Sequence, residues 1–222
     1  MDNNELSGTF LSQYRSPLSD FRDQVKQWVA SEAKVVQQLD EESIHDRRNR
    51  TVFVVSFGVW DMWNMIEKSS SDATKSVDHN IEVIIGQLDV LFQHWENDDL
   101  KIILTLVPDV TFLPAFRPVG DQRVSQYKDT VKLVAYWNQK LREAAEQWVK
   151  GTIYLFDTEA FVLDLIRDRQ LFAAGVEELN GLGLNQDPGW ENVDDPCVES
   201  SQQWAVTSEG KRCQSPDKYL FW

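Results

Sequence analysis

Apolar residues recur along this chain in two patterns, one typical of strands and the other of helices. Short apolar runs at 52–55, 100–107 and 152–156 have the length and the β-branched content of strands. The first run, VFVV, has no polar position, which is typical of a parallel strand that is buried on both faces. Longer segments, in which apolar residues return every three or four positions, separate these runs.

Four helices are predicted from that three-to-four spacing, over about 19–39, 76–95, 123–150 and 158–169. The second has the clearest core-facing stripe: Val77, Ile81, Ile84, Ile85, Leu88, Leu91, Phe92 and Trp95. The corresponding stripes on the third and fourth helices are Val124, Tyr127, Val131, Val134, Leu141, Ala145 and Trp148, then Phe161, Leu165 and Ile166.

Several segments lack any periodicity and are predicted to be irregular. They are the start at 1–16, a charged linker at 40–50, a polar loop at 69–72 and a loop-rich tail from about 175, where Gly, Asn, Asp and Pro dominate. Helices and strands alternate before that tail, which predicts an α/β fold with a parallel sheet and helices on both faces. We expect one domain over residues 1–222.

Polar and aromatic residues follow directly after the first predicted strand. They are Gly58, Trp60, Asp61, Trp63 and Asn64. In open α/β sheets, ligands bind outside the carboxyl ends of the strands, and a glycine there allows a turn or a close backbone approach. These residues therefore form a candidate binding site. The alternative interpretation is that Asp61 caps the next segment and that both Trp side chains are core.

A long loop after the second predicted strand carries two further candidates. Phe112 and Phe116 lie in the segment 109–120, again past the carboxyl end of a strand. Their rings could line a pocket for an acyl chain or a sugar. The alternative is that they fill the space beneath the loop.

The segment FVVSFGVWDMWN, residues 53–64, resembles the third conserved block of the GDSL/SGNH hydrolases in its fungal form, written G-x-N-D. Further similar stretches are DVTFLPAF at 109–116, the segment 179–200 and CQSPDKYLFW at 213–222. Gly58 and Asp61 match the block, whereas Trp60 stands where the family has its oxyanion-binding Asn. The resemblance implies a three-layer α/β/α, flavodoxin-like core, a secreted parent protein and a serine ester hydrolase.

The other catalytic motifs of that family do not occur in the chain. The G-D-S block with the nucleophile is absent, and so is the D-x-x-H block, which in the family closely follows a segment like YLFW. We therefore expect the interior of such a hydrolase, without its first strands, its catalytic Ser or its Asp-His pair, and inactive as given. The indole N–H of Trp60 is a donor, but its longer ring would not place that donor where the Asn amide lies.

Two functions are consistent with these features. The first is a GDSL/SGNH-type hydrolase of acyl or acetyl esters of lipids or polysaccharides, represented by an incomplete product. The second is a non-catalytic, acidic protein that keeps the scaffold and binds a sugar or an acyl chain through Trp60, Trp63 and Phe112. A small-molecule or polysaccharide ester is thus the expected ligand.

Charge and motif content exclude several other classes. The formal net charge of −14 argues against binding to nucleic acid or to an anionic membrane surface. No apolar run approaches the roughly 20 residues of a membrane span. Zinc spacing, a calcium loop and a phosphate-binding glycine loop are all missing, so neither a metal nor a cofactor is predicted. The start lacks the apolar core of a signal peptide, so the localisation of the chain as given stays open.

Two features would suit an oxidising compartment. Cys197 and Cys213 are the only cysteines and lie close together in the tail, so we expect them to form a disulfide; the alternative is two free thiols. Asn49 begins the triplet Asn-Arg-Thr, a glycosylation sequon of a kind that also occurs by chance.

The resemblance also predicts that the sheet has an unpaired edge at the strand 52–55. In the resembled fold, two more strands lie beside the strand at 52–55, and this chain does not contain them. An unpaired apolar strand edge is a template for association, so we expect the chain to self-associate through this edge.

Overall fold

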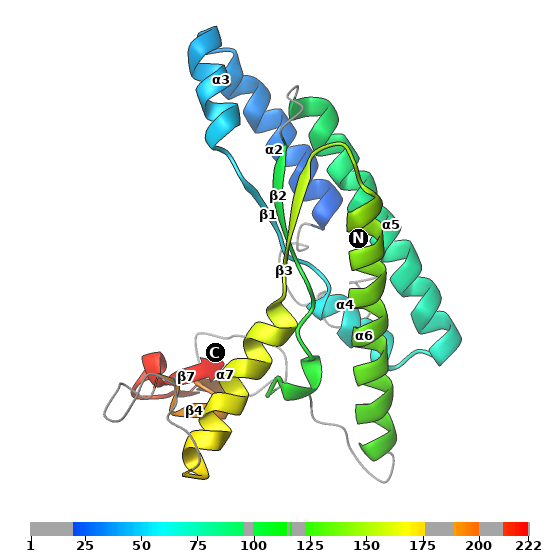
Figure 1. Cartoon of the computed structure of the whole chain (residues 1–222), viewed down its shortest axis with the longest axis vertical. Helices are drawn as coiled ribbons and strands as arrows, with labels where there is room; N and C mark the ends of the chain where they lie inside the picture. Colours follow the sequence, from blue (N-terminus) through cyan, green and yellow to red (C-terminus); the bar gives the residue numbers. More distant parts are fainter. Residues whose placement is uncertain are drawn as a thin grey trace. The chain divides into compact units, whose positions relative to one another are not determined.

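The computed structural model (Figure 1) describes residues 20–95, 100–114, 116, 123–175, 189–199 and 211–221. The chain forms two compact units. The first comprises Met1–Val107 with Lys132–Phe156, and the second comprises Pro108–Val131 with Asp157–Trp222. The expectation of one domain stays a prediction, and the units are described separately. No helix among the described residues has both the length and the apolar character needed to cross a membrane.

The first unit contains a parallel, three-stranded sheet. Its strands are β1 (Phe53–Val55), β2 (Lys101–Thr105) and β3 (Thr152–Phe156), in the order β1-β2-β3. All three lie within the predicted apolar runs, and β3 matches its prediction residue for residue. The predicted α/β fold with a parallel sheet is confirmed.

Helices cover this sheet and make its crossover connections. They are α2 (Phe21–Val36), α3 (Glu41–Arg50), α4 (Val59–Ile66), α5 (Ser70–Trp95) and the part of α6 (Arg123–Gln147) that follows Lys132. α4 and α5 connect β1 to β2, and α6 lies between β2 and β3, as parallel strands require. In Figure 1, α5 and α6 lie on the same side of the sheet.

An aromatic cluster joins β1 to helices α2 and α5. The ring centroids of Trp28 and Phe53 lie 4.9 Å apart, those of Phe53 and Trp95 5.1 Å, and those of Trp28 and Trp95 5.7 Å. Two of the three contacts have an edge-to-face geometry, which adds about 0.5–1.5 kcal/mol per pair to the burial of apolar area. This cluster fixes α2 and α5 against the covered face of the sheet.

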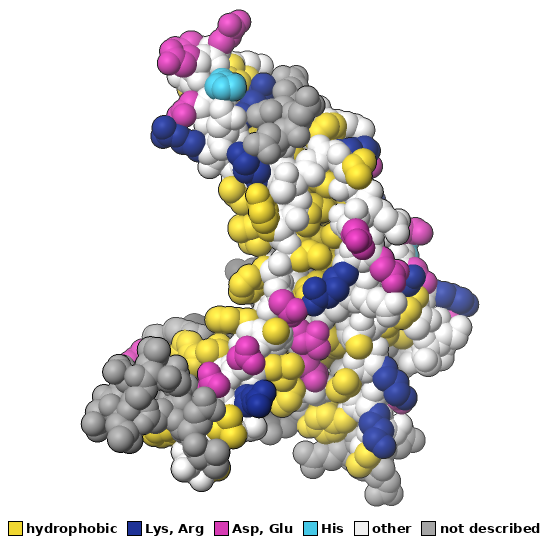
Figure 2. All heavy atoms as spheres, in the orientation of Figure 1, with side chains coloured by type: hydrophobic (Ala, Val, Ile, Leu, Met, Phe, Trp, Pro, Cys, Tyr) yellow, Lys and Arg dark blue, Asp and Glu magenta, His cyan; other side chains and the backbone are white. Residues whose placement is uncertain are grey.

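The opposite face of the sheet is exposed. Val52, Val54 and Tyr154 have exposed fractions of 46%, 67% and 57%, whereas the alternate residues of the strands, such as Val55 and Ile102, are buried. The expectation that the first strand is buried on both faces is therefore wrong. β1 is an edge strand, and the described helices of this unit pack on one face only. Figure 2 shows hydrophobic side chains on the surface in this part of the molecule.

The segment predicted as a charged linker is the helix α3. Asp40 is its N-cap, and the Oδ1 atom accepts a hydrogen bond from the backbone N–H of Ser43 at 2.8 Å. The hydrogen bonds from the Ser43 side chain and backbone lower the pKa of Asp40. Acidic residues lie in the first turn and arginines in the last, which suits the helix dipole. None of its residues is buried, so apolar periodicity could not reveal it.

An ion pair attaches α3 to α2. The Nε and Nη2 atoms of Arg47 donate to the two carboxylate oxygens of Glu32 at 2.8 and 2.7 Å. This bidentate pairing raises the pKa of Arg47, chiefly through the hydrogen bond to Glu32. Glu32 is buried, so its charge is compensated where solvent cannot reach it.

Helix starts and stripes differ from the predictions in three places. α5 begins at Ser70, because the hydroxyl of Ser69 accepts from the backbone N–H of Asp72 and donates to its carboxylate. The predicted loop at 69–72 is thus mostly helix. On α6, Val124 and Val131 are exposed, and its buried face instead includes Thr130, Leu133, Trp137 and Asn138. On α7 (Thr158–Ala173), Phe161 is exposed, and Ile166 is the buried member of the predicted stripe.

The second unit contains η2 (Val110–Phe112), α7 (Thr158–Ala173) and a small β region. β4 (Asn192–Pro196) pairs in parallel with β7 (Tyr219–Phe221), η3 (Pro216–Lys218) precedes β7, and β5 (Val198–Glu199) pairs antiparallel with β6 (Lys211–Arg212). The described parts of the tail are therefore more regular than predicted. The predicted irregular segments at 1–16 and 176–188 lie outside the described residues.

A disulfide joins Cys197 to Cys213, as predicted. The backbone N–H of Cys213 also donates to the carbonyl of Cys197 at 2.7 Å. Closing a loop of this length contributes about 3 kcal/mol in the chain-entropy treatment.

A charged contact between α5 and the end of α6 provides a test of the fold. Asp89 accepts a hydrogen bond from the indole N–H of Trp148 at 2.8 Å and pairs with the ammonium of Lys150 at 2.9 Å. Burial alone would raise the pKa of Asp89. The hydrogen bonds from Lys150 and Trp148 and the charge of Lys150 outweigh this effect, so the pKa is lowered.

We expect Asp89→Asn to lower the free energy of unfolding at pH 7 by about 1 kcal/mol, because the neutral amide loses the ion pair with Lys150 and accepts only a weaker hydrogen bond from Trp148. The contribution is fully present above the unfolded pKa of about 3.9 and is lost as the pH falls through the lowered folded pKa. Urea unfolding at pH 7 and at low pH measures it. Asp46→Asn, which breaks the exposed pair with Arg50, is the control and should lower the free energy of unfolding by less than Asp89→Asn does. If Asp89→Asn lowered the free energy of unfolding equally at both pH values, the ionised carboxylate of Asp89 would not be the source of this stability.

Candidate functional site

The turn that follows β1 has a conformation that only glycine tolerates. Gly58 has a φ of 119°, in the region that disfavours residues with a side chain. A Cβ atom at this position would overlap Cγ2 of Val107 and would lie 3.0 Å from the ring of Trp137. The predicted close approach at Gly58 is therefore present, and it brings β1, the end of β2 and α6 together.

Asp61 lies in the first turn of α4 and is buried. Its Oδ1 atom accepts a hydrogen bond from the side-chain amide of Asn80, on α5, at 3.2 Å. The N-cap of α4 is Gly58 and not Asp61. The position still suits a carboxylate, because the start of a helix stabilises negative charge. Asp61 thus links α4 to α5 inside the first unit.

The two tryptophans of α4 do not both belong to the core. Trp60 is 46% exposed, and Trp63 and Asn64 are half-buried. Met62 and Met65 fill the buried side of this helix instead. The interpretation that both tryptophans are core is wrong for Trp60, because the helix turns that position towards solvent. Trp60 consequently offers an exposed aromatic ring directly after the turn.

A side-chain clamp at the end of β2 was missed by the sequence analysis. The amide of Asn138, on α6, donates to the carbonyl of Val107 at 2.8 Å, and its oxygen accepts from the N–H of Val107 at 2.9 Å. Both backbone groups of Val107 are thereby satisfied beyond the strand. The only available signal was a polar residue within the apolar spacing of α6.

A pair of hydroxyls lies at the carboxyl ends of β1 and β2. Thr105 donates to the Oγ atom of Ser56 at 2.9 Å, and Ser56 is exposed. The three histidines of the chain, His45, His79 and His94, are exposed on α3 and α5. Within the described parts of the chain, no group of three or more His, Cys, Asp or Glu side chains gathers as a metal site would require.

The loop residues Phe112 and Phe116 belong to the second unit, whereas 58–64 belong to the first. Phe116 is buried and packs on Tyr127 with ring centroids 4.9 Å apart, so it fills space beneath the loop. Phe112, at the end of η2, is partly exposed. Asp109 holds this turn by accepting hydrogen bonds from the N–H and the hydroxyl of Thr111.

The sequon residue Asn49 is exposed near the end of α3. Its Nδ2 atom lies 2.9 Å from Nε2 of His45, one turn earlier. The hydroxyl of Thr51, the third residue of the sequon, donates to the carbonyl of Arg47 at 2.8 Å. The triplet is thus at the surface, and its use as a glycosylation site stays a prediction.

No protein-family model matches the chain, and no curated protein sequence matches it. The resemblance to GDSL/SGNH hydrolases consequently depends on the residues quoted for it.

The close contact at Gly58 gives a matched pair of substitutions. Gly58→Ala should lower the free energy of unfolding by about 2 kcal/mol or more, because the new methyl group meets Val107 and the positive φ is strained. Gly86→Ala on α5 meets no atom within 4 Å and should raise it by up to about 1 kcal/mol. Thermal and urea unfolding of both variants measure the difference. A neutral Gly58→Ala would show that the turn has room to relax.

Proposed function

We propose that this chain is the interior of a GDSL/SGNH-type hydrolase that acts on acyl or acetyl esters of lipids or polysaccharides. In this proposal the sheet of the first unit belongs to a three-layer, flavodoxin-like core. The chain by itself is inactive, because it contributes the third conserved block and lacks the catalytic Ser and the Asp-His pair. The parent protein would be secreted.

The observation that carries the proposal is the turn from β1 into α4. Gly58 and Asp61 are the two residues that match the G-x-N-D block. Gly58 has a positive φ and no room for a Cβ atom, and Asp61 is buried in the first turn of the next helix. The two matching positions therefore have a structural explanation. The tight turn after the strand requires a glycine, and the next helix begins with a buried Asp.

The sheet supports the proposal in a second way. β1 pairs with β2 on one side, and the described residues place no strand on its other side. The proposed hydrolase has its first two strands at that edge, and its nucleophile follows the first of them. Added strands would therefore bring a G-D-S turn to the carboxyl end of the sheet, near Gly58.

Reconstitution tests this function. The chain alone should hydrolyse p-nitrophenyl acetate no faster than buffer, because it has neither a positioned nucleophile nor a base. Adding the neighbouring coding segments, with a G-D-S run upstream and a D-x-x-H run downstream, should produce turnover that Ser→Ala in G-D-S abolishes. Flanking sequences without these runs would refute the proposal. So would turnover by the chain alone that Ser56→Ala removes.

Trp60 provides a finer test within the reconstituted enzyme. A single oxyanion donor contributes about 10²–10³ in kcat, and Trp60 occupies the position of that donor. Trp60→Asn should therefore raise kcat by about tenfold or more. Trp63→Asn, on the same helix, is the matched control and should not raise it.

The exposed ring of Trp60 favours one alternative function, the non-catalytic binding of a sugar or an acyl chain. Aromatic side chains line most small-molecule sites. In that case soluble oligosaccharides or short fatty acids should change the tryptophan fluorescence of the chain, and Trp60→Ala should reduce the affinity about tenfold. A signal that persists unchanged in Trp60→Ala would exclude this use of Trp60.

A further inference from the structure

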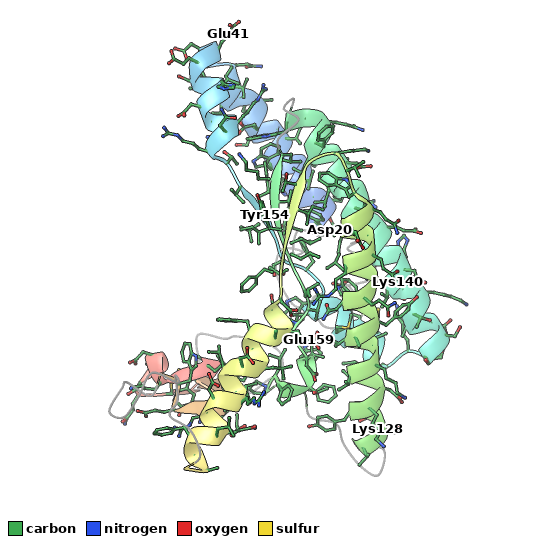
Figure 3. All side chains as sticks on the ribbon, viewed as in Figure 1. Asp20, Glu41, Lys128, Lys140, Tyr154 and Glu159 are labelled. Atoms are coloured by element: carbon green, nitrogen blue, oxygen red, sulfur yellow. A yellow bond between two sulfur atoms is a disulfide. The ribbon has the colours of Figure 1, made fainter. Side chains whose placement is uncertain are left out.

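The triplet Asn49-Arg50-Thr51 is a feature of the first unit that the proposed ester hydrolysis does not use. It is the only Asn-x-Ser/Thr triplet in the sequence. Figure 3 labels Glu41, the first residue of α3, at the end of that helix that lies away from the sheet. The helix runs from there to Arg50, shortly before β1 begins at Phe53. The triplet therefore lies where α3 leads into the sheet.

Helix α3 has room for a bulky group at Asn49. The side chain of Asn49 is exposed, and none of the residues of α3 is buried. A glycan at this position would thus displace no packed side chain, as its size requires. Asn49 precedes the amino end of β1, whereas the turn at Gly58 follows the carboxyl end. The glycan would be attached at the end of β1 opposite to the candidate site.

The disulfide between Cys197 and Cys213 gives an independent argument for modification. Disulfides form in oxidising compartments such as the lumen of the endoplasmic reticulum, where N-linked glycans are also attached. A chain that acquires its disulfide there presents its single acceptor triplet to the glycan transferase. This inference depends on that route and does not depend on the proposed ester hydrolysis.

The polar groups of the triplet are engaged in the folded chain. The Nδ2 atom of Asn49 lies 2.9 Å from Nε2 of His45, and its carbonyl accepts from the ammonium of Lys101 at 3.1 Å. The hydroxyl of Thr51 donates to the carbonyl of Arg47 at 2.8 Å. Only Ser or Thr completes an acceptor triplet, so this hydroxyl takes part in the transfer. The folded helix consequently withholds both groups that the transferase needs.

We propose that Asn49 carries an N-linked glycan and that this glycan is attached before α3 forms. The donor is an oligosaccharide joined to a lipid through a diphosphate. Nδ2 bonds to C1 of the first sugar as the bond from C1 to the diphosphate oxygen breaks. The lipid diphosphate leaves with the bonding electrons, and Nδ2 loses one proton to a base of the transferase. The product amide keeps one N–H, which can contact His45 once α3 has formed.

Translation of the whole chain behind a cleavable leader, with microsomes present, tests the site. Among chains whose leader has been removed, most wild-type and Thr51→Ser chains should carry a glycan that peptide-N-glycosidase releases. Asn49→Gln and Thr51→Val chains should carry none. Leader removal shows that a chain has reached the compartment of the transferase. Processed wild-type chains without a glycan would therefore overturn the proposal, and so would a glycan on Asn49→Gln chains.

The order of events is tested on the folded chain, purified from bacteria that lack the transferase and then incubated with transferase and lipid diphosphate donor. Transfer to the wild type should be at least about tenfold slower than to Arg47→Ala, whose α3 is no longer attached to Glu32, because the hydrogen bonds of the triplet must open first. Asp46→Ala, which breaks only the exposed pair with Arg50, is the matched control and should behave as the wild type. Equal transfer to all three chains would overturn the proposed order.

Circular dichroism and thermal unfolding establish that each variant is folded before its transfer rate is compared. If Arg47→Ala is not folded, Asp40→Ala replaces it, because this change removes the N-cap of α3 and leaves the triplet intact.

Discussion

The close approach of backbone and side chains at Gly58 is the constraint on which the first unit depends. The turn after β1 has to pass against Val107, at the end of β2, and against Trp137, on α6. Asn138, the next residue of α6, holds both backbone groups of Val107. Two strand ends and two helices therefore meet at a point where a single added methyl group has no space. The candidate site is built on this contact, because α4 with Trp60 and Asp61 starts there.

Charged contacts attach the outer elements to that centre. Glu32 and Arg47 join α2 to α3 through two parallel hydrogen bonds, and Asp89 joins α5 to the end of α6. Each of these carboxylates is at least partly withdrawn from water, so its partner matters more than in an exposed pair. The apolar core lies between these contacts and one face of the sheet. The other face of the sheet is exposed at Val52, Val54 and Tyr154.

Much of the fold could be predicted from local patterns. The strand at 152–156, the stripe of α5 and the disulfide between Cys197 and Cys213 follow from residue types and spacing. The helix α3 could not be predicted in this way, because it buries no residue and depends on its cap and on Arg47. For the candidate site, the sequence indicated Gly58 and Asp61 but not their partners, since Val107, Trp137 and Asn80 are distant in the chain.

The sequence by itself determined the three strands of the parallel sheet, the existence of helices α2, α5, α6 and α7, and the need for glycine in the turn after β1. Each of these depends on short-range periodicity or on the backbone freedom of one residue. Only the tertiary structure decided that Val54 is exposed, that Trp60 points to solvent and that Asn138 clamps the end of β2. An apolar run has the same pattern whether one face of its strand or both are covered. The choice is made by which remote segments pack on the sheet, and local pattern carries no information about that.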